Sequence, residues 1–228
     1  MAENKIQMSD SLLVAMLLTI SGGFLDAYTY IVRGGVFSNA QTGNIVLFGI
    51  SLFEKNFVES IDYLMPILAF IFGILIADTI KDHFHDRRAF HWRQFVLVIE
   101  LIVLAAAAFM PNSCDVYVNT LISFVCALQV ESFRKVMGSP FATTMCTGNL
   151  RSATAQLYKF HKERDRDALT SSLRYFFIIS LFAAGAGIGA ILSRIFFRLA
   201  VLFAGAPILA VTFILAKSPD TPAGKYLG

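Results

Sequence analysis

Long apolar runs alternate with short polar connections along most of the 228-residue chain. The runs are Ser11–Val32, Met65–Ile80, Phe95–Met110, Val116–Gln129, Tyr175–Leu192 and Arg198–Ala216. A helix needs about 20 predominantly apolar residues to cross the hydrocarbon core of a bilayer, which is about 30 Å thick. With their polar flanks, these runs predict an all-α, polytopic membrane protein of about six transmembrane helices.

The composition agrees with this interpretation. Hydrophobic residues make up 56% of the chain and charged residues 15%, whereas about 25% of the residues of a soluble domain are charged. The apolar runs leave little sequence for a separate soluble domain, so we expect a single integral-membrane domain over residues 1–228. The first run is longer than the apolar part of a secretory signal and continues into Asp26 and Tyr28, which predicts a retained helix.

A short motif occurs twice, as Thr42-Gly43-Asn44 and as Thr147-Gly148-Asn149. Shifting the chain by 105 positions aligns the two triplets without a gap and also aligns Asp26 with Glu131. An acid in an apolar helix, followed at the same separation by the same triplet, indicates an internal duplication. The predicted repeats cover residues of about 10–110 and about 115–216.

Each triplet opens an apolar segment that is too short to cross a membrane. Thr42–Phe53 has 12 residues, which span about 18 Å as a helix. The basic stretches 81–93 and 159–174 should both be cytoplasmic, while the connection "PNSCD" has no Lys or Arg. Both conditions hold if the triplet segments are re-entrant half-helices, which gives six spans and cytoplasmic termini. Three spans per repeat make the two repeats inverted, with the amino ends of the half-helices facing each other near the membrane midplane.

Facing amino ends would form a binding site, because free N–H groups and the positive ends of helix dipoles attract anions and polar solutes. The candidate substrate-binding residues are Thr42, Gly43, Asn44, Thr147, Gly148 and Asn149. Thr42 and Thr147, or neighbouring Ser and Asn residues, are candidate caps for the half-helices. The same triplet is also an ordinary capping sequence, so a purely structural role stays open.

Asp26 and Glu131 are candidates for coupling or gating, because an ionisable group in an apolar span is expensive and by default indicates function. A structural alternative pairs Glu131 with Arg134 or Lys135, and pairs Asp26 with Arg33 or uses it to cap a helix break at Gly22-Gly23. Glu100 is a third candidate. Its position about two turns into its span makes snorkelling or an Arg partner an equal alternative.

No pattern in the chain indicates catalysis, a metal or a cofactor. The four histidines lie in the basic connections without converging cysteine or acidic ligands, and the three cysteines form no Cys-x-x-Cys pair. The net charge of +3 is concentrated in the connections, where it reports membrane topology rather than a nucleic-acid partner. We therefore expect a non-enzymatic protein with no metal, no cofactor and no nucleic-acid partner.

The stretch "GGFLDAYTYIVRGGVFSNAQTGNIVLFG" and its echo "ALQVESFRKVMGSPFATTMCTGNL" resemble the YoaK-like family of bacterial inner-membrane proteins. The resemblance rests on Gly22-Gly23, Asp26-Ala27, Val36-Phe37 and the first triplet. It implies a polytopic bacterial plasma-membrane protein of about six spans and no established activity. Where the family usually shows a Gln-Asn-Ala motif, this chain has Gln129-Val130-Glu131-Ser132.

The residues themselves favour a secondary transporter or channel for a small polar or anionic solute. In this hypothesis the two half-helix starts form a midplane site and the buried acids couple or gate the movement. The alternative is a membrane scaffold or accessory protein without transport, in which the same motifs are structural. The expected partners are membrane lipids and the unidentified solute, and a homo-oligomer is an open alternative.

Overall fold

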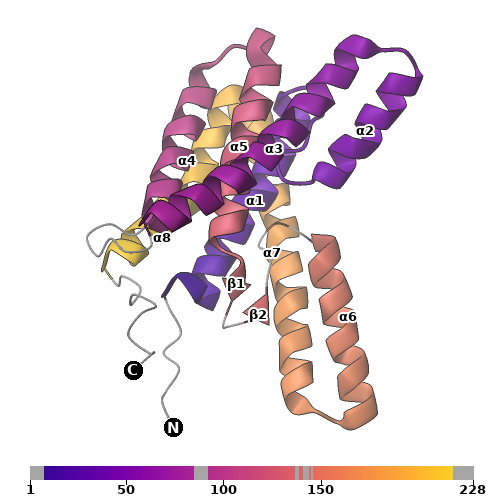
Figure 1. Cartoon of the computed structure of the whole chain (residues 1–228), viewed down its shortest axis with the longest axis vertical. Coiled ribbons are helices and arrows are strands. Elements are labelled where there is room, and N and C mark those ends of the chain that lie inside the picture. The colour runs from indigo at the N-terminus through magenta and orange to yellow at the C-terminus, as the bar shows by residue number, and fades with distance from the viewer. Residues whose placement is uncertain (1–7, 85–91, 137–138, 141–143, 145, 218–228) are drawn as a thin grey trace.

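The computed structural model describes residues 8–84, 92–136, 139–140, 144 and 146–217, and these residues form a helical bundle (Figure 1). The α-helices are α1 (Leu12–Val32), α2 (Gln41–Phe53), α3 (Phe57–Phe84), α4 (Trp92–Phe109), α5 (Asp115–Ser132), α6 (Cys146–Glu163), α7 (Arg166–Phe196) and α8 (Val201–Lys217). The 3₁₀ turns are η1 (Met8–Asp10), η2 (Asn112–Cys114) and η3 (Phe197–Ala200). Two short antiparallel strands, β1 (Lys135–Val136) and β2 (Ser139–Pro140), precede α6.

Five helical segments of the described residues are long and apolar enough to cross a membrane. Four of them contain α1, α3, α4 and α5, and the fifth runs for 52 residues over Arg166–Lys217. That last segment holds both α7 and α8, which are separated by a turn in which Phe197 has a φ of 50°. The chain is therefore a multi-pass membrane protein by length and composition.

The helices pack in a regular set of pairs. α1 lies against α7 and α8, α5 lies against α3 and α4, and α4 also contacts α8. α2 packs on α3 and α6 packs on α7, the helix that follows each of them. α2 has 13 residues, but α6 has 18, as many as α4 and α5, so the prediction of a short segment after the second triplet is wrong. The main apolar core is buried among α1, α4, α5 and α8, where Leu18, Leu97, Ile122 and Ile208 are fully enclosed.

Glycines allow the closest of these contacts. A β-carbon at Gly73 of α3 would lie 2.6 Å from the Phe124 carbonyl oxygen of α5. A β-carbon at Gly185 of α7 would overlap the Ile20 carbonyl oxygen of α1. Small residues at these positions let the helix backbones approach closely, as is typical of helix packing in membranes.

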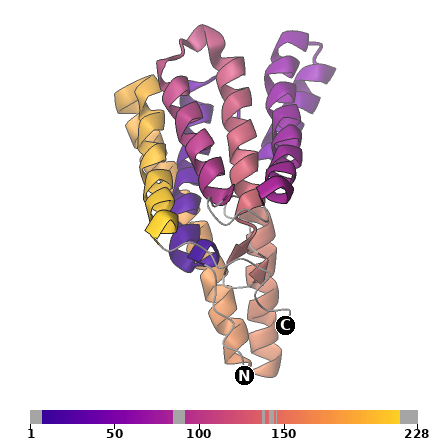
Figure 2. The ribbon, with the colours of Figure 1, turned by 60° about the vertical axis from the view of Figure 1, so that its left-hand side comes forward.

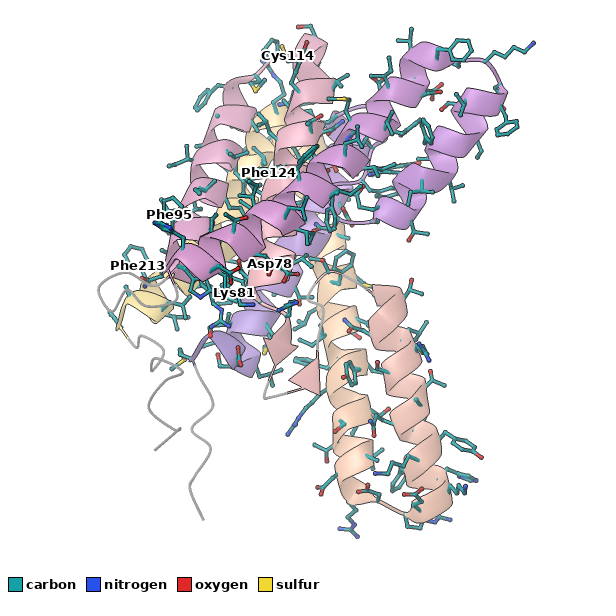
Figure 3. All side chains as sticks on the ribbon, in the orientation of Figure 1. Asp78, Lys81, Phe95, Cys114, Phe124 and Phe213 are labelled. Atoms are coloured by element: carbon teal, nitrogen blue, oxygen red, sulfur yellow. The ribbon has the colours of Figure 1, made fainter. Side chains whose placement is uncertain are left out.

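The ends of the helices lie at three levels of the molecule. The α2–α3 tip and η2 lie at the top, the ends of α3 and α8 lie near the middle height, and the α6–α7 tip extends to the bottom (Figures 1 and 2). Figure 3 places Cys114 at the top and Lys81 near the middle height. The end of α3 and the α6–α7 tip therefore both lie below η2, at different levels.

Candidate functional site

The connection between α1 and α2 turns back into the bundle. Arg33 ends α1 beside η2, and Gly34 and Gly35, with φ of 83° and 79°, reverse the chain there. Six residues later, the Asn39 side-chain amide donates to the Gly22 carbonyl at 3.2 Å. Gly22 lies eleven residues before Arg33, which is a rise of about 16 Å along the helix. α2 therefore begins near half the length of α1 and runs back toward the end where α1 finished (Figure 1).

The outer end of this connection is anchored by Arg33, whose side chain is completely buried. The guanidinium forms an ion pair with Asp115 at 2.9 Å and donates to the Ala107 and Met110 carbonyls at 2.8 and 3.1 Å. Its Nε donates to the Tyr28 hydroxyl at 2.9 Å. The pairing of Arg33 with Asp26 that the sequence left open is wrong, because these contacts hold the guanidinium at the η2 end of α1.

The Asp26 carboxylate binds the amino end of α2. Its Oδ1 accepts the backbone N–H of Asn39 at 2.6 Å and the Ser38 hydroxyl at 3.0 Å, and the N–H of Ala40 also faces it. Ala40 is the N-cap residue of α2 and supplies no side-chain cap. Asp26 is 5% exposed, and no described Lys or Arg forms an ion pair with it. A carboxylate from α1 thus takes the place of a local cap.

The second connection reaches the same level of α1. A β-carbon at Gly22 would lie 2.5 Å from the Thr144 methyl carbon, so Thr144 packs directly on this glycine. Thr144 is the position that the 105-residue shift aligns with Asn39. α6 begins at Cys146 and runs the opposite way from α2 (Figures 1 and 2). The amino ends of α2 and α6 therefore converge on the middle of α1.

The first triplet is arranged around Asn44, which is fully buried. The Asn44 side chain accepts the Phe37 N–H at 2.9 Å and donates to the Phe37 carbonyl at 2.7 Å. Gly43 passes close to the Phe37 ring, where a β-carbon would lie 2.8 Å from a ring carbon. Thr42 is exposed and lies inside the first turn of α2, so its predicted role as the cap is wrong: the cap position falls on Ala40.

The second triplet lies in the first turn of α6. Thr147 and Gly148 are exposed, and nothing lies within 4 Å of a β-carbon built at Gly148. Asn149 is buried, with 4% of its surface exposed. In both triplets, therefore, the asparagine faces the protein while the threonine faces outward.

Glu131 differs from Asp26 in its surroundings, although the 105-residue shift aligns the two acids. It lies one residue before the end of α5 and forms an ion pair with Arg134 at 2.9 Å. Arg134 is largely exposed, and Asp78 of α3 also contacts the Glu131 carboxyl. This is the ion pair that the structural alternative predicted for Glu131.

Most of the chain matches known proteins. The model of the family described as "Protein of unknown function (DUF1275)" matches residues 14–215. The chain belongs to the DUF1275 family. It is also similar to the "UPF0700 transmembrane protein YoaK" of Bacillus subtilis (strain 168), with 25% identity over 191 residues, which cover 80% of this chain and 84% of that protein. No solved structure matches it.

In this DUF1275 chain, the structure shows a second buried carboxyl, that of Glu100, which was the third candidate in the sequence. Glu100 is fully buried in α4, and the amide end of the Gln129 side chain lies 3.1 Å from both carboxyl oxygens. The expected snorkelling or Arg partner for Glu100 is wrong for the described residues, because Gln129 of α5 occupies that place. The available signal was Gln129 itself, a polar residue at the end of the apolar run Val116–Gln129.

The Cys126 thiol of α5 is buried near the amino end of α2. It lies beside the Ser38 and Asn39 side chains, and the charges of Asp26 and Glu100 both act on it. The Asn39 side-chain oxygen is buried and has no hydrogen-bond partner among the described residues. Buried polar groups of α5 therefore lie beside the segment that Asp26 binds.

Proposed function

We propose that this protein is a secondary transporter for a small polar or anionic solute, which binds between the amino ends of α2 and α6 at mid-membrane. The observation that carries the proposal is the Asp26 carboxylate, which holds the amino end of α2 at the level of Gly22. Irregular backbone at membrane depth is tolerated where it is buried in protein or lines a hydrated path, and transporters place their sites on such elements.

In this mechanism, Asp26 couples binding of the solute to uptake of a proton. The N–H groups at the start of α2 form an anion site, and Asp26 fills it in the present conformation. A protonated carboxyl is a weaker acceptor, so protonation loosens the Ser38–Asn39 segment and releases these N–H groups. An anionic solute can then replace Asp26, which links solute binding to proton uptake.

The ligands of the solute are the first-turn N–H groups around Thr42-Gly43-Asn44 and Thr147-Gly148-Asn149. The Asn44 side chain is engaged by Phe37, so it shapes the connection instead of contacting the solute. Glu131 would act at the membrane edge, where it is paired with Arg134.

An inverted repeat underlies the proposed architecture. Under the correspondence of α1–α4 with α5–α8, the pair α1·α7 becomes α5·α3, α1·α8 becomes α5·α4, and α2·α3 becomes α6·α7, all of which occur. The opposite directions of α2 and α6 support the same operation. Counting α7 and α8 separately gives six spans. We place the protein in a bacterial plasma membrane with both termini cytoplasmic, in contact with lipid, and with transport rather than catalysis as its role.

The test is proton movement in proteoliposomes that contain a trapped pH-sensitive dye. A panel of phosphate, nitrate, formate and small neutral polyols is added in turn, and transport predicts an internal pH change for at least one compound. Asp26→Asn should abolish that change at unchanged protein incorporation, and Glu131→Gln should retain it. A wild-type response in Asp26→Asn refutes the coupling role of Asp26.

One observation favours the alternative of a membrane scaffold or accessory protein. The Asn44 side-chain amide accepts the Phe37 N–H and donates to the Phe37 carbonyl, as the side chain of a structural cap would. In that case Asp26 only fixes the α1–α2 connection. Asp26→Asn would then lower thermal stability, and no compound in the panel would move protons with wild-type protein.

A further inference from the structure

Glu100 is a buried acid outside the proposed transport site. It lies in α4, across α5 from the amino end of α2. None of its side chain is exposed, and it stands near the middle of the apolar span Trp92–Phe109. No described Lys or Arg forms an ion pair with it. An unpaired carboxylate at this depth is strongly unfavourable, whereas a protonated carboxyl is tolerated.

The Gln129 amide can form a hydrogen bond with both the ionised and the protonated form of this carboxyl. The amide atom that faces Glu100 lies 3.1 Å from both Oε1 and Oε2. With its nitrogen in that place, Gln129 donates to a carboxylate, and with its oxygen there it accepts the O–H of the protonated acid. A half-turn of the amide therefore keeps Glu100 hydrogen-bonded in either state.

The groups around Glu100 leave it without a competing charge. α5 contributes Cys126 and Gln129, and α8 carries no titratable side chain before Lys217 at its end. On α3, Asp78 and Lys81 act on Glu131, and Arg198 of η3 bonds the Met110 carbonyl beyond the far end of α4. The protonation of Glu100 is thus set mainly by burial and by Gln129.

We infer that Glu100 and Gln129 form a proton-binding site inside the membrane, in which Glu100 takes up and releases the proton and the Gln129 amide partners both states. The Cys126 thiol of α5, three residues before Gln129, lies beside Ser38 and Asn39, which bind Asp26. Only the use of this proton in coupling rests on the proposed transport function.

The experiment is labelling with dicyclohexylcarbodiimide, an apolar reagent that modifies protonated carboxyls within membranes. Wild-type protein in liposomes is treated across a pH series, and the modified residue is located by mass spectrometry of peptides. We expect modification of Glu100 that falls about tenfold per pH unit above its midpoint. Glu131→Gln, which changes the acid paired with Arg134, is the matched control and should leave the Glu100 profile unchanged.

Gln129→Leu tests the role of the amide. Because a hydrogen bond to a carboxylate is worth more than one to a neutral acid, its loss should move the labelling midpoint upward by about one pH unit. Absence of Glu100 labelling at every pH, or a pH-independent extent, overturns the proton site, and an unchanged midpoint in Gln129→Leu overturns the amide's part in it. The labelling needs no solute, so pH-dependent labelling beside a failed flux assay would refute transport and leave the proton site standing.

Discussion

The strongest consequence of the Asp26 contacts concerns how firmly the α1–α2 connection is held to α1. Asp26→Asn keeps the size of the side chain and removes its charge. Hydrogen bonds to a charged acceptor are worth about 1.5–3 kcal/mol and neutral ones about 0.5–1.5. The change affects the bonds from Asn39 N–H and Ser38 Oγ, at 2.6 and 3.0 Å. The attachment of the connection should therefore weaken by about 2–3 kcal/mol.

Hydrogen exchange measured by mass spectrometry reads this attachment directly. Peptides that contain Asn39 and Ala40 should exchange about 30- to 150-fold faster in Asp26→Asn at alkaline pH, if exchange follows local opening. Wild-type protein should show the same acceleration on acidification, after correction for the intrinsic pH dependence of exchange. The variant should not respond in this way, because it has lost the titrating group.

The peptides that cover the end of α5 should not change in Asp26→Asn, and Glu131→Gln should leave exchange at Asn39 unaltered. Equal protection of the Asn39 peptides in wild type and Asp26→Asn at every pH would refute the reasoning. It would show that the carboxylate contributes nothing measurable to holding the amino end of α2.

Three further predictions concern the bundle. Arg33→Gln should lower stability by about 3–5 kcal/mol, seen as a lower thermal midpoint in detergent, because the buried ion pair with Asp115 is broken, and adding Asp115→Asn should recover part of the loss. Gly73→Leu should destabilise by at least about 1–3 kcal/mol in the same assay, since α3 touches the α5 backbone there, while Gly148→Ala, with open space around it, should not. Cys114 should react with a membrane-impermeant maleimide in intact cells, and protection of Cys114 until permeabilisation would contradict the proposed topology.

The apolar spans could be predicted from the sequence because their signal is local. A run of about 20 apolar residues has few stable alternatives to a transmembrane helix, whatever surrounds it. The repeated triplet likewise located the starts of α2 and α6, which begin within a residue of Thr42 and Thr147. The separation of the acids from the triplets, however, did not reveal which acid would be buried.

Asp26 and Glu131 differ in burial and in partners because their helices end at different distances beyond them. α1 continues to Val32, six residues beyond Asp26, while α5 ends at Ser132, one residue beyond Glu131. Glu131 therefore reaches Arg134 at the edge of the bundle, and Asp26 stays inside it. Helix ends depend on tertiary contacts as well as on local sequence, so positions that the 105-residue shift aligns can receive different environments.

By itself, the sequence determined that this chain is a membrane protein and roughly where its long apolar helices lie. The tertiary structure decided the partners of the buried polar groups: Asp26 with the amino end of α2, Arg33 with Asp115, and Glu100 with Gln129. The physical reason is the distance along the chain over which each effect acts. Partition into lipid depends on the composition of one segment, whereas satisfying a buried charge requires groups from segments far apart in the chain, which only the packed bundle brings together.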